Sequence, residues 1–131
     1  MPTYQGSCHC GAVRIEVSKD EPISRLLDCN CSICAKKGIL HTPVPDAELS
    51  ITVGADDLVL YQFGSSVAEH KFCRYCGIHV IGRPRNAPER HTVNARCLDQ
   101  FAQLVADIEI VKFNGHDHPK DCPKDHPRDR A

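Results

Sequence analysis

Alternating apolar and polar positions give the main secondary-structure signal along this chain. Residues 12–17 (AVRIEV) alternate as a half-buried strand does. Residues 58–63 and 69–72 look like the two arms of a hairpin, and the intervening Gly64-Ser65-Ser66 suits its turn. Later strands are expected at residues 78–81, 91–95 and 107–111. The pattern predicts an all-β or mainly β protein.

One segment has a helical period. Leu98, Phe101 and Leu104 are three residues apart, which predicts a short helix over residues 98–104. Prolines are expected to mark the connections between strands, because proline removes a backbone donor and favours turns. These prolines are Pro22, Pro43, Pro45, Pro84 and Pro88.

Length and composition indicate one small domain. The 131 residues suit a single domain, and its core should be aliphatic because aromatic residues make up 5% of the chain and Trp is absent. The end of the chain repeats a tetrad of acid, variable residue, proline and base, which cannot bury enough apolar surface to become ordered. We expect a zinc-binding domain over residues 1–115 and a disordered Asp/Pro/Lys-rich tail over residues 116–131. The ligand-type residues of that tail are interpreted as incidental: His116, His118, Cys122 and His126.

Charge and hydropathy exclude some partners. The formal net charge is -1 and the isoelectric point is about 6.7, so the chain lacks a basic field for nucleic acid or a membrane surface. No apolar run approaches the roughly 18 residues of a membrane-spanning helix, and residues 1–5 lack the pattern of a signal peptide. We expect a cytoplasmic protein with no nucleic-acid or membrane partner. The pattern does not indicate an oligomeric state.

Cysteine is the strongest chemical signal. There are nine cysteines, an odd number, and seven of them fall in three close-spaced clusters. Cysteines one or two residues apart are poor disulfide partners, because the small ring strains the dihedral that the bond prefers. The same spacing allows two thiolates to bind one ion. The sequence therefore predicts metal binding, and zinc is the ion that such thiolate sets usually hold.

The three clusters contain seven sulfurs, which divide as four plus three. They are Cys8-His9-Cys10-Gly11, Cys29-Asn30-Cys31-Ser32-Ile33-Cys34 and Cys73-Arg74-Tyr75-Cys76-Gly77. Four thiolates close a structural zinc site, whereas three leave a position open for water or a substrate. Spacing alone leaves two groupings possible.

In the first grouping, Cys31 and Cys34 join Cys73 and Cys76 as a zinc ribbon, which leaves Cys8, Cys10 and Cys29. In the second, Cys8 and Cys10 join Cys73 and Cys76, which leaves the compact triple. The second is preferred on local grounds, because three thiolates within six residues can surround one face of an ion unaided.

The clusters and their neighbours resemble one family. Residues 6–13 (GSCHCGAV), 28–38 (DCNCSICAKKG), 72–77 (FCRYCG) and 93–99 (VNARCLD) are similar to the glutathione-dependent formaldehyde-activating enzymes, a family that includes centromere protein V. The resemblance runs from about Tyr4 to Asn114. It implies a mainly β, Mss4-like domain of short twisted sheets with zinc knuckles and two zinc ions per chain. It places a structural ion on Cys8, Cys10, Cys73 and Cys76, and an open, catalytic ion on Cys29, Cys31 and Cys34.

An open zinc site with three thiolates suits a substrate that carries sulfur, because the ion stabilises a thiolate at neutral pH. The resemblance implies a carbon–sulfur lyase that acts on glutathione or other thiol adducts of aldehydes, such as S-hydroxymethylglutathione. Candidates for proton transfer are His41, His79 and His91, and each is otherwise a half-buried strand residue. Asn94 could orient the substrate or satisfy a turn, and Cys97 is interpreted as a core residue. Arginines that could bind substrate carboxylates are Arg14, Arg74, Arg83, Arg85 and Arg96.

Two alternatives to an enzyme stay open. One is a zinc-stabilised module that binds a thiol or a protein without turnover. The other is a zinc store or redox sensor, whose exposed thiolates would release the metal on oxidation.

Overall fold

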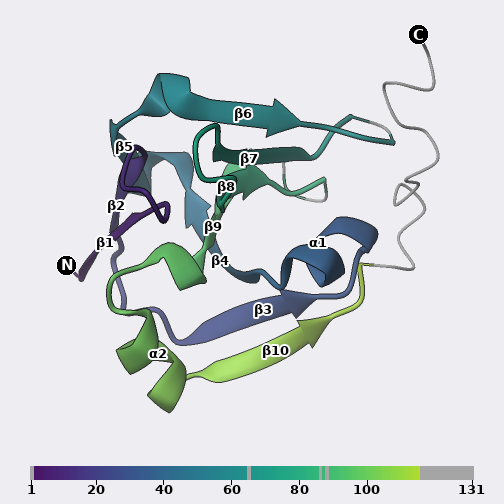
Figure 1. Cartoon of the computed structure of the whole chain (residues 1–131). Coiled ribbons are helices and arrows are strands. Elements are labelled where there is room, and N and C mark those ends of the chain that lie inside the picture. Colours follow the sequence, from purple (N-terminus) through teal and green to yellow (C-terminus); the bar gives the residue numbers. More distant parts are fainter. Residues whose placement is uncertain (1, 65, 86, 88, 116–131) are drawn as a thin grey trace, which may run out of the picture.

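The N-terminal strands form a small antiparallel sheet. The computed structural model describes residues 2–64, 66–85, 87 and 89–115, and its ten strands in this part form two sheets. In the three-stranded sheet, β2 (Arg14–Ser18) lies between β1 (Thr3–Ser7) and β5 (Leu49–Val53). Figure 1 shows this sheet beside the N-terminus, at the left of the view.

The second sheet contains seven strands and curves around the core (Figure 1). Adjacent strands within this sheet pair antiparallel, except that β10 and β3 run parallel. In spatial order the strands are β10 (Glu109–Phe113), β3 (Arg25–Cys29), β4 (Leu40–Pro45), β9 (Arg90–Asn94), β8 (His79–Arg83), β7 (Glu69–Cys73) and β6 (Leu58–Tyr61). The predicted hairpin is confirmed, because β6 and β7 pair with Leu58 opposite Cys73. The mainly β fold class is likewise confirmed.

The helices differ from the prediction. The expected helix over residues 98–104 is observed as α2 (Phe101–Asp107), preceded by a 3-10 turn at Ala95–Cys97. Residues 98 and 99 stay outside the helix because they attach to β1. Leu98 forms a bridge with Gly6, and the Asp99 N–H donates to the Gln5 carbonyl at 2.8 Å.

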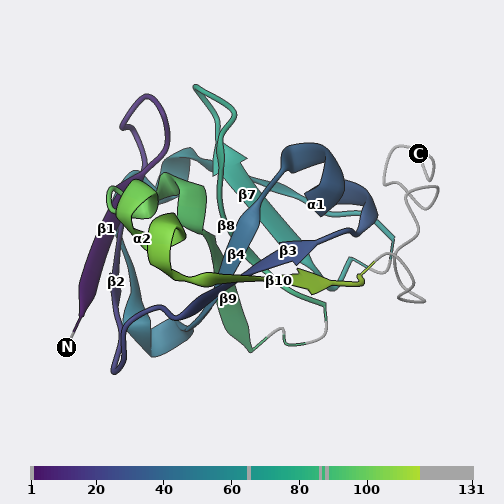
Figure 2. The same ribbon diagram turned by 90° about the horizontal axis from the view of Figure 1, so that it is seen from below.

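A second helix, α1 (Ser32–Lys37), was not predicted, because its six residues are too few to show a period. Two further 3-10 turns, Asp46–Glu48 and Ala55–Asp57, connect strands. Figure 2 shows α1 near the carboxyl ends of β3 and β10, and α2 at the opposite end of β10.

Pro43 and Pro45 correct one expectation. They lie inside β4 and not in a connection, and they pair with Thr92 and Arg90 of β9. The ladder between β3 and β4 involves only Leu40 and His41 among the residues of β4. Among the described residues, β4 therefore has no strand partner on its β3 side beyond His41, so proline removes no ladder hydrogen bond there.

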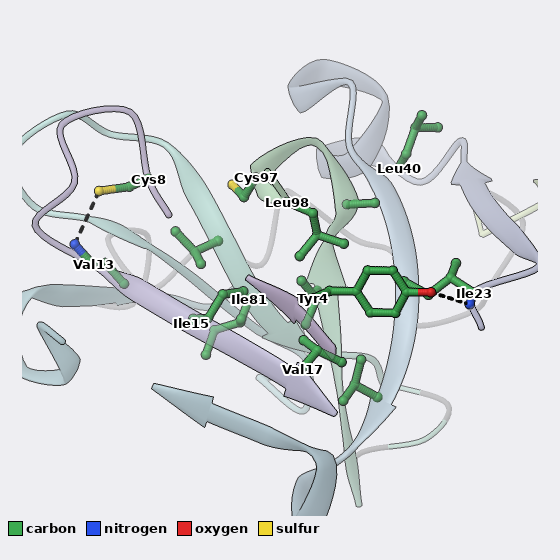
Figure 3. Close-up of a cluster of buried hydrophobic side chains, with 14 of the residues drawn as sticks. Tyr4, Cys8, Val13, Ile15, Val17, Ile23, Leu40, Ile81, Cys97 and Leu98 are labelled. Atoms are coloured by element: carbon green, nitrogen blue, oxygen red, sulfur yellow. Dashed lines mark hydrogen bonds between the residues drawn. The ribbon is translucent and has the colours of Figure 1, made fainter. Parts of the chain in front are cut away.

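The core is aliphatic, as composition predicted. Its largest fully buried side chains are Leu26, Ile39, Ile81, Val13, Val17, Val44, Val80 and Val93, with Cys73 beside them. Tyr4 is the one buried aromatic residue of the main cluster among the described residues. Its hydroxyl accepts a hydrogen bond from the Ile23 N–H at 3.0 Å (Figure 3), so burying this polar atom leaves no unmet hydrogen bond.

In the described part of the chain, no helix has the length and apolar character needed to cross a membrane. The tail predicted over residues 116–131 lies outside the described residues, so its disorder stays a prediction.

Candidate metal centres

Four cysteine sulfurs gather between the two sheets. The Sγ atoms of Cys8, Cys10, Cys73 and Cys76 all lie within 4.8 Å of one another, and the set could hold a metal ion. Cys10 Sγ is 3.7 Å from both Cys8 Sγ and Cys73 Sγ. Tetrahedral zinc with Zn–S bonds of about 2.3 Å places its sulfurs about 3.8 Å apart. The sulfur separations therefore fit zinc.

Two tight turns bring these sulfurs together. After β1, the Cys8 N–H donates to the Val13 carbonyl, and Gly11 has a φ of 81°. After β7, the Cys73 N–H donates to the Ile78 carbonyl, and Gly77 has a φ of 77°. Left-handed backbone of this kind favours glycine, so each motif ends in the residue that its turn needs.

This four-sulfur cluster connects the sheets. Cys8 and Cys10 follow a strand of the three-stranded sheet, whereas Cys73 ends β7 of the seven-stranded sheet. Cys8 and Cys73 are buried, and Cys10 is exposed. A metal ion held here would cross-link the two sheets at the edge of their shared core.

Backbone donors favour the thiolate form in this cluster. The Val13 N–H points at Cys8 Sγ at 3.3 Å (Figure 3), and the Tyr75 N–H at Cys73 Sγ at 3.4 Å. Burial raises the pKa of the Cys8 thiol. Hydrogen bonds from the Val13 N–H and from the Cys10 and Cys73 thiols outweigh this effect, so the pKa of Cys8 is lowered overall. For Cys76, burial is likewise outweighed by the N–H groups of Cys10 and Ile78, and the pKa falls to about 6.

Three further sulfurs form a second cluster at the end of β3. The Sγ atoms of Cys29, Cys31 and Cys34 lie within 4.8 Å of one another and could hold a metal ion. Cys29 ends β3, Cys31 caps α1, and Cys34 lies within α1. The Cys34 N–H donates to Cys31 Sγ at 3.4 Å, which satisfies a free donor of the first helical turn. The structure thus brings together the compact triple and not the zinc-ribbon grouping.

The three sulfurs share negative charge. Hydrogen bonds from the Cys29 and Cys34 thiols lower the pKa of Cys31 to about 2. The hydrogen bonds of Cys34 to Cys29 and to Cys31 raise the pKa of Cys34. His41 on β4 contacts this cluster through Nε2, which lies 3.1 Å from Cys34 Sγ. The cluster therefore offers one thiolate beside two thiols, with an imidazole next to Cys34, and a soft divalent cation suits such a donor set.

Gly115 passes directly over this cluster, and no pattern near it in the sequence indicates this role. A Cβ on residue 115 would lie 2.7 Å from Cys29 Sγ and 3.1 Å from Cys31 Cβ. The Arg85 guanidinium donates to the Gly115 carbonyl. Glycine is required here because no side chain fits between the backbone and the sulfurs.

A cavity of about 200 Å³ adjoins the three-sulfur cluster. Its wall includes all three cysteines, and much of the rest is apolar: Leu27, Ile33, Pro43, Ala68, Pro84 and Phe113. Arginines also line it, and they are Arg83, Arg85 and Arg90. The cavity therefore combines a cluster of sulfurs, apolar walls and guanidinium groups.

Three buried imidazoles complete the wall. His41, His70 and His79 are each at least nine-tenths buried and line the cavity. Within the described part of the chain, His41 Nδ1, His70 Nε2 and His79 Nε2 are buried without a hydrogen-bond partner. Burial, followed by the charge of Lys37, lowers the pKa of His79 to about 2 and that of His70 to about 4. These imidazoles are neutral at physiological pH.

Some of the other predicted site residues line the cavity, and others lie away from it. Arg83 and Arg85 line the cavity, whereas Arg14, Arg74 and Arg96 do not. Arg90 and His70 line it and were not predicted, because nothing near them in the sequence marks a site. His91 lies outside the cavity wall, with Nδ1 2.6 Å from Asp46 Oδ1.

Asn94 and Cys97 both bind backbone. The Asn94 amide donates to the His79 carbonyl at 2.9 Å, and its oxygen accepts from the Arg96 N–H at 3.2 Å. Cys97 belongs to the hydrophobic core, as predicted. The Cys97 thiol also donates to the His79 carbonyl at 3.4 Å, so both residues support β8, and Asn94 in addition caps the turn that follows β9.

Comparison with known proteins identifies the family. The model of the glutathione-dependent formaldehyde-activating enzyme family matches residues 3–113. The chain therefore belongs to this family.

Named relatives and one solved structure agree with this. An uncharacterized lyase of Schizosaccharomyces pombe is 26% identical over 114 residues, covering 84% of this chain and 79% of the relative. A putative glutathione-dependent formaldehyde-activating enzyme of Halomonas elongata is 36% identical, covering 55% of this chain and 50% of the relative. A crystal structure of a Rhodobacter sphaeroides protein is 35% identical, with a TM-score of 0.73, covering 82% of this chain and 99% of that one. The chain thus spans about half the length of some of the relatives that carry the enzyme name.

Proposed function

We propose that this protein is a zinc-dependent carbon–sulfur lyase that acts on thiol adducts of aldehydes, glutathione adducts of the S-hydroxymethylglutathione type among them. The observation that carries the proposal is the position of the three-sulfur cluster. Cys29, Cys31 and Cys34 lie in the wall of a cavity, so an ion held by them would face a space where a substrate could bind. Family membership and the lyase and enzyme names of relatives support the same reaction class.

The two cysteine clusters would have different roles. The four-sulfur cluster provides a closed donor set for a structural zinc. The three-sulfur cluster would hold its ion with only three protein sulfurs and would leave room for the sulfur of a substrate. Zinc bound there supplies a Lewis acid that stabilises the substrate's sulfur as a thiolate.

The reaction exchanges an adduct with its parts. In cleavage, the C–S bond breaks and its electron pair stays on sulfur, while the hydroxyl oxygen loses its proton and becomes the carbonyl oxygen of the aldehyde. The net change is R–S–CH2–OH to R–SH and CH2=O, so atoms and charge balance. The chain's residues bind the sulfur, orient the adduct and limit the access of water through the apolar part of the wall.

The arginines would recognise acidic groups of the thiol. Arg83 forms salt bridges with Asp46 (Nη2 to Oδ2, 3.2 Å) and with Glu69 (Nε to Oε1, 3.7 Å), and these fix its guanidinium at the cavity wall. Arg85 is fixed by the Gly115 carbonyl. Guanidinium groups bind carboxylates with paired hydrogen bonds, and glutathione carries two carboxylates.

The first experiment measures zinc per chain by elemental analysis and thiol–aldehyde exchange by ¹³C exchange NMR, with glutathione and ¹³C-formaldehyde as probes. We expect two zinc ions and accelerated exchange in the wild type. We expect one zinc ion, a retained fold and no acceleration in Cys31→Ser. Wild-type protein that binds glutathione without accelerating exchange would overturn the enzyme in favour of a binding module. Loss of zinc at low peroxide, with no response to glutathione, would favour a redox sensor.

A further inference from the structure

We propose that His79 is the group that binds the aldehyde-derived oxygen, through a neutral Nε2–H whose tautomer is set by Lys37. This inference rests on the proposed function, because it assigns a role within the same cavity. It gives the cavity two ends, one for the sulfur of the adduct and one for its oxygen.

The contact between Lys37 and His79 determines where the imidazole proton lies. Lys37 Nζ is 3.2 Å from His79 Nδ1. A protonated lysine can only donate hydrogen bonds, so Nδ1 must accept. A neutral imidazole that accepts at Nδ1 carries its proton on Nε2. His79 therefore presents a fixed N–H donor.

That donor has no acceptor within the described part of the chain. His79 is 5% exposed, and its Nε2 is buried without a hydrogen-bond partner. Buried polar atoms in folded proteins are nearly always paired, because an unpaired donor costs roughly 1–3 kcal/mol. An orphaned donor in a cavity wall therefore indicates a ligand with an acceptor atom.

The neighbouring residues place this donor beside the cavity. The ring's Cε1, which joins Nδ1 and Nε2, lies beside Gly82, where a Cβ would approach it to 3.5 Å. Gly82 lines the same cavity as His79 and the three cysteines. The His70 ring lies 6.1 Å from the His79 ring and has its own unpartnered Nε2. His70 and His79 thus both line this cavity, and each carries an unpartnered Nε2.

The environment keeps His79 neutral. Burial is the main cause of the lowered pKa of His79, and the positive charge of Lys37 lowers that pKa further. A neutral imidazole polarises a carbonyl or stabilises an alkoxide by hydrogen bonding without giving up its proton. In synthesis of the adduct, the thiolate sulfur forms the C–S bond, the carbonyl π electrons move to oxygen, and that oxygen takes a proton from water. The hydrogen bond from Nε2–H would be strongest while the oxygen carries charge.

The test begins with the tautomer. Long-range ¹H–¹⁵N correlation spectra of the full-length, zinc-loaded protein, labelled at histidine, should show His79 with its proton on Nε2, the resonance being assigned from His79→Gln. Lys37→Met should remove this preference, and Lys37→Arg should restore it. Addition of glutathione together with formaldehyde should shift the Nε2 resonance, whereas glutathione alone should not. A His79 proton on Nδ1 in the wild type would overturn the proposal.

Kinetic measurements then test the role of His79 separately from the lyase activity itself. Removal of one oxyanion donor typically costs 10²–10³ in turnover. We expect His79→Phe to lose exchange by about this factor, while His79→Gln, whose amide can replace the Nε2 donor, stays within about tenfold of wild type. Binding of S-methylglutathione, which lacks the oxygen, should be the same in all three proteins. His91→Gln is the matched control, because His91 lies outside the cavity wall.

Two outcomes are distinguishable. An active wild type with His79→Phe within twofold of it would overturn the role of His79 and leave the lyase intact. A wild type without exchange activity would overturn the lyase, and the role of His79 with it. Circular dichroism and zinc content of each variant show whether a loss reflects the fold.

Discussion

The backbone of Gly115 lies so close to Cys29 that a Cβ at residue 115 would stand 2.7 Å from the Cys29 sulfur. The two residues are far apart in sequence and meet because β10 pairs in parallel with β3, with Phe113 opposite Cys29. The strand that follows the last helix thus ends over the three-sulfur cluster. This relationship makes the three-sulfur cluster sensitive to one methyl group.

Gly115→Ala should weaken zinc binding at the three-sulfur cluster and leave the four-sulfur cluster loaded. The added methyl must displace Cys29 Sγ, and changes next to metal ligands typically lower affinity by 10–100-fold. Elemental analysis after dialysis against a weak chelator should show one zinc per chain where the wild type keeps two. The control is Cys29→Ala, in which the sulfur is absent, so adding Gly115→Ala should change zinc content no further. Unchanged zinc content in the single variant would contradict the close packing.

The two clusters should differ in their effect on folding. Cys73→Ser removes a ligand of the cluster that joins the two sheets, and structural zinc contributes on the order of 10 kcal/mol to small modules. We expect this variant to unfold or to melt at a much lower temperature. Cys34→Ser removes a ligand of the three-sulfur cluster, where all three cysteines belong to β3, α1 and the connection between them. It should lose one zinc and keep most of its circular dichroism. The reverse result would show that the roles of the clusters are exchanged.

The parts of the fold that were predictable have local signals. The alternation at residues 12–17 corresponds to β2, because a period of two reports directly on which face is buried. The hairpin arms at 58–63 and 69–72 correspond to β6 and β7, because two strand-like runs are separated by turn residues. β1 and β3 gave no such signal: their sequences, TYQGS and RLLDC, are too short and too irregular. β4 was not predicted, because its two prolines are more typical of a connection. The strand tolerates them because its ladder with β3 ends at His41, before the first proline.

The candidate site was predictable only where its ligands are close in sequence. Cys29, Cys31 and Cys34 show themselves by spacing. Lys37, His70 and Gly115 carry no local mark, because their positions depend on contacts between α1, β7, β8 and the end of β10. The sequence therefore indicated the sulfur cluster but not the wall of the cavity.

Tyr4→Phe should destabilise the protein through a single hydrogen bond. The Tyr4 hydroxyl accepts from the Ile23 N–H at 3.0 Å, and both residues are buried. Without the hydroxyl the N–H is left unpaired in the core, which costs roughly 1–3 kcal/mol. Urea unfolding at fixed free zinc measures the change in free energy. Tyr75→Phe is the control, since Tyr75 is 66% exposed, and it should change stability by less than about 0.5 kcal/mol. Equal effects would show that the Tyr4 hydroxyl adds nothing.

Acid should destabilise the protein in part through His70. Burial, and then the charge of Lys37, lowers the pKa of His70 in the folded state from 6.5 to about 4. Between these values the unfolded chain binds a proton that the folded protein does not, so stability is full above pH 6.5 and falls as pH drops toward 4. From pH 7 to pH 5 the loss from this one group is about 2 kcal/mol.

The measurement compares wild type with His70→Phe. In the wild type the His70 ring stacks on Phe63 with 5.7 Å between the ring centroids, and the phenyl ring of the variant can keep this stacking. Both proteins contain the same cysteines, so acid-driven release of zinc affects them equally and cancels in the difference. Denaturant unfolding at pH 7 and at pH 5 should show that the variant loses about 2 kcal/mol less than wild type. Identical losses would mean that His70 titrates alike in the folded and unfolded chains, and that its imidazole is open to solvent. A larger loss in the variant would mean that protonated His70 stabilises the fold, against the sign that its burial requires.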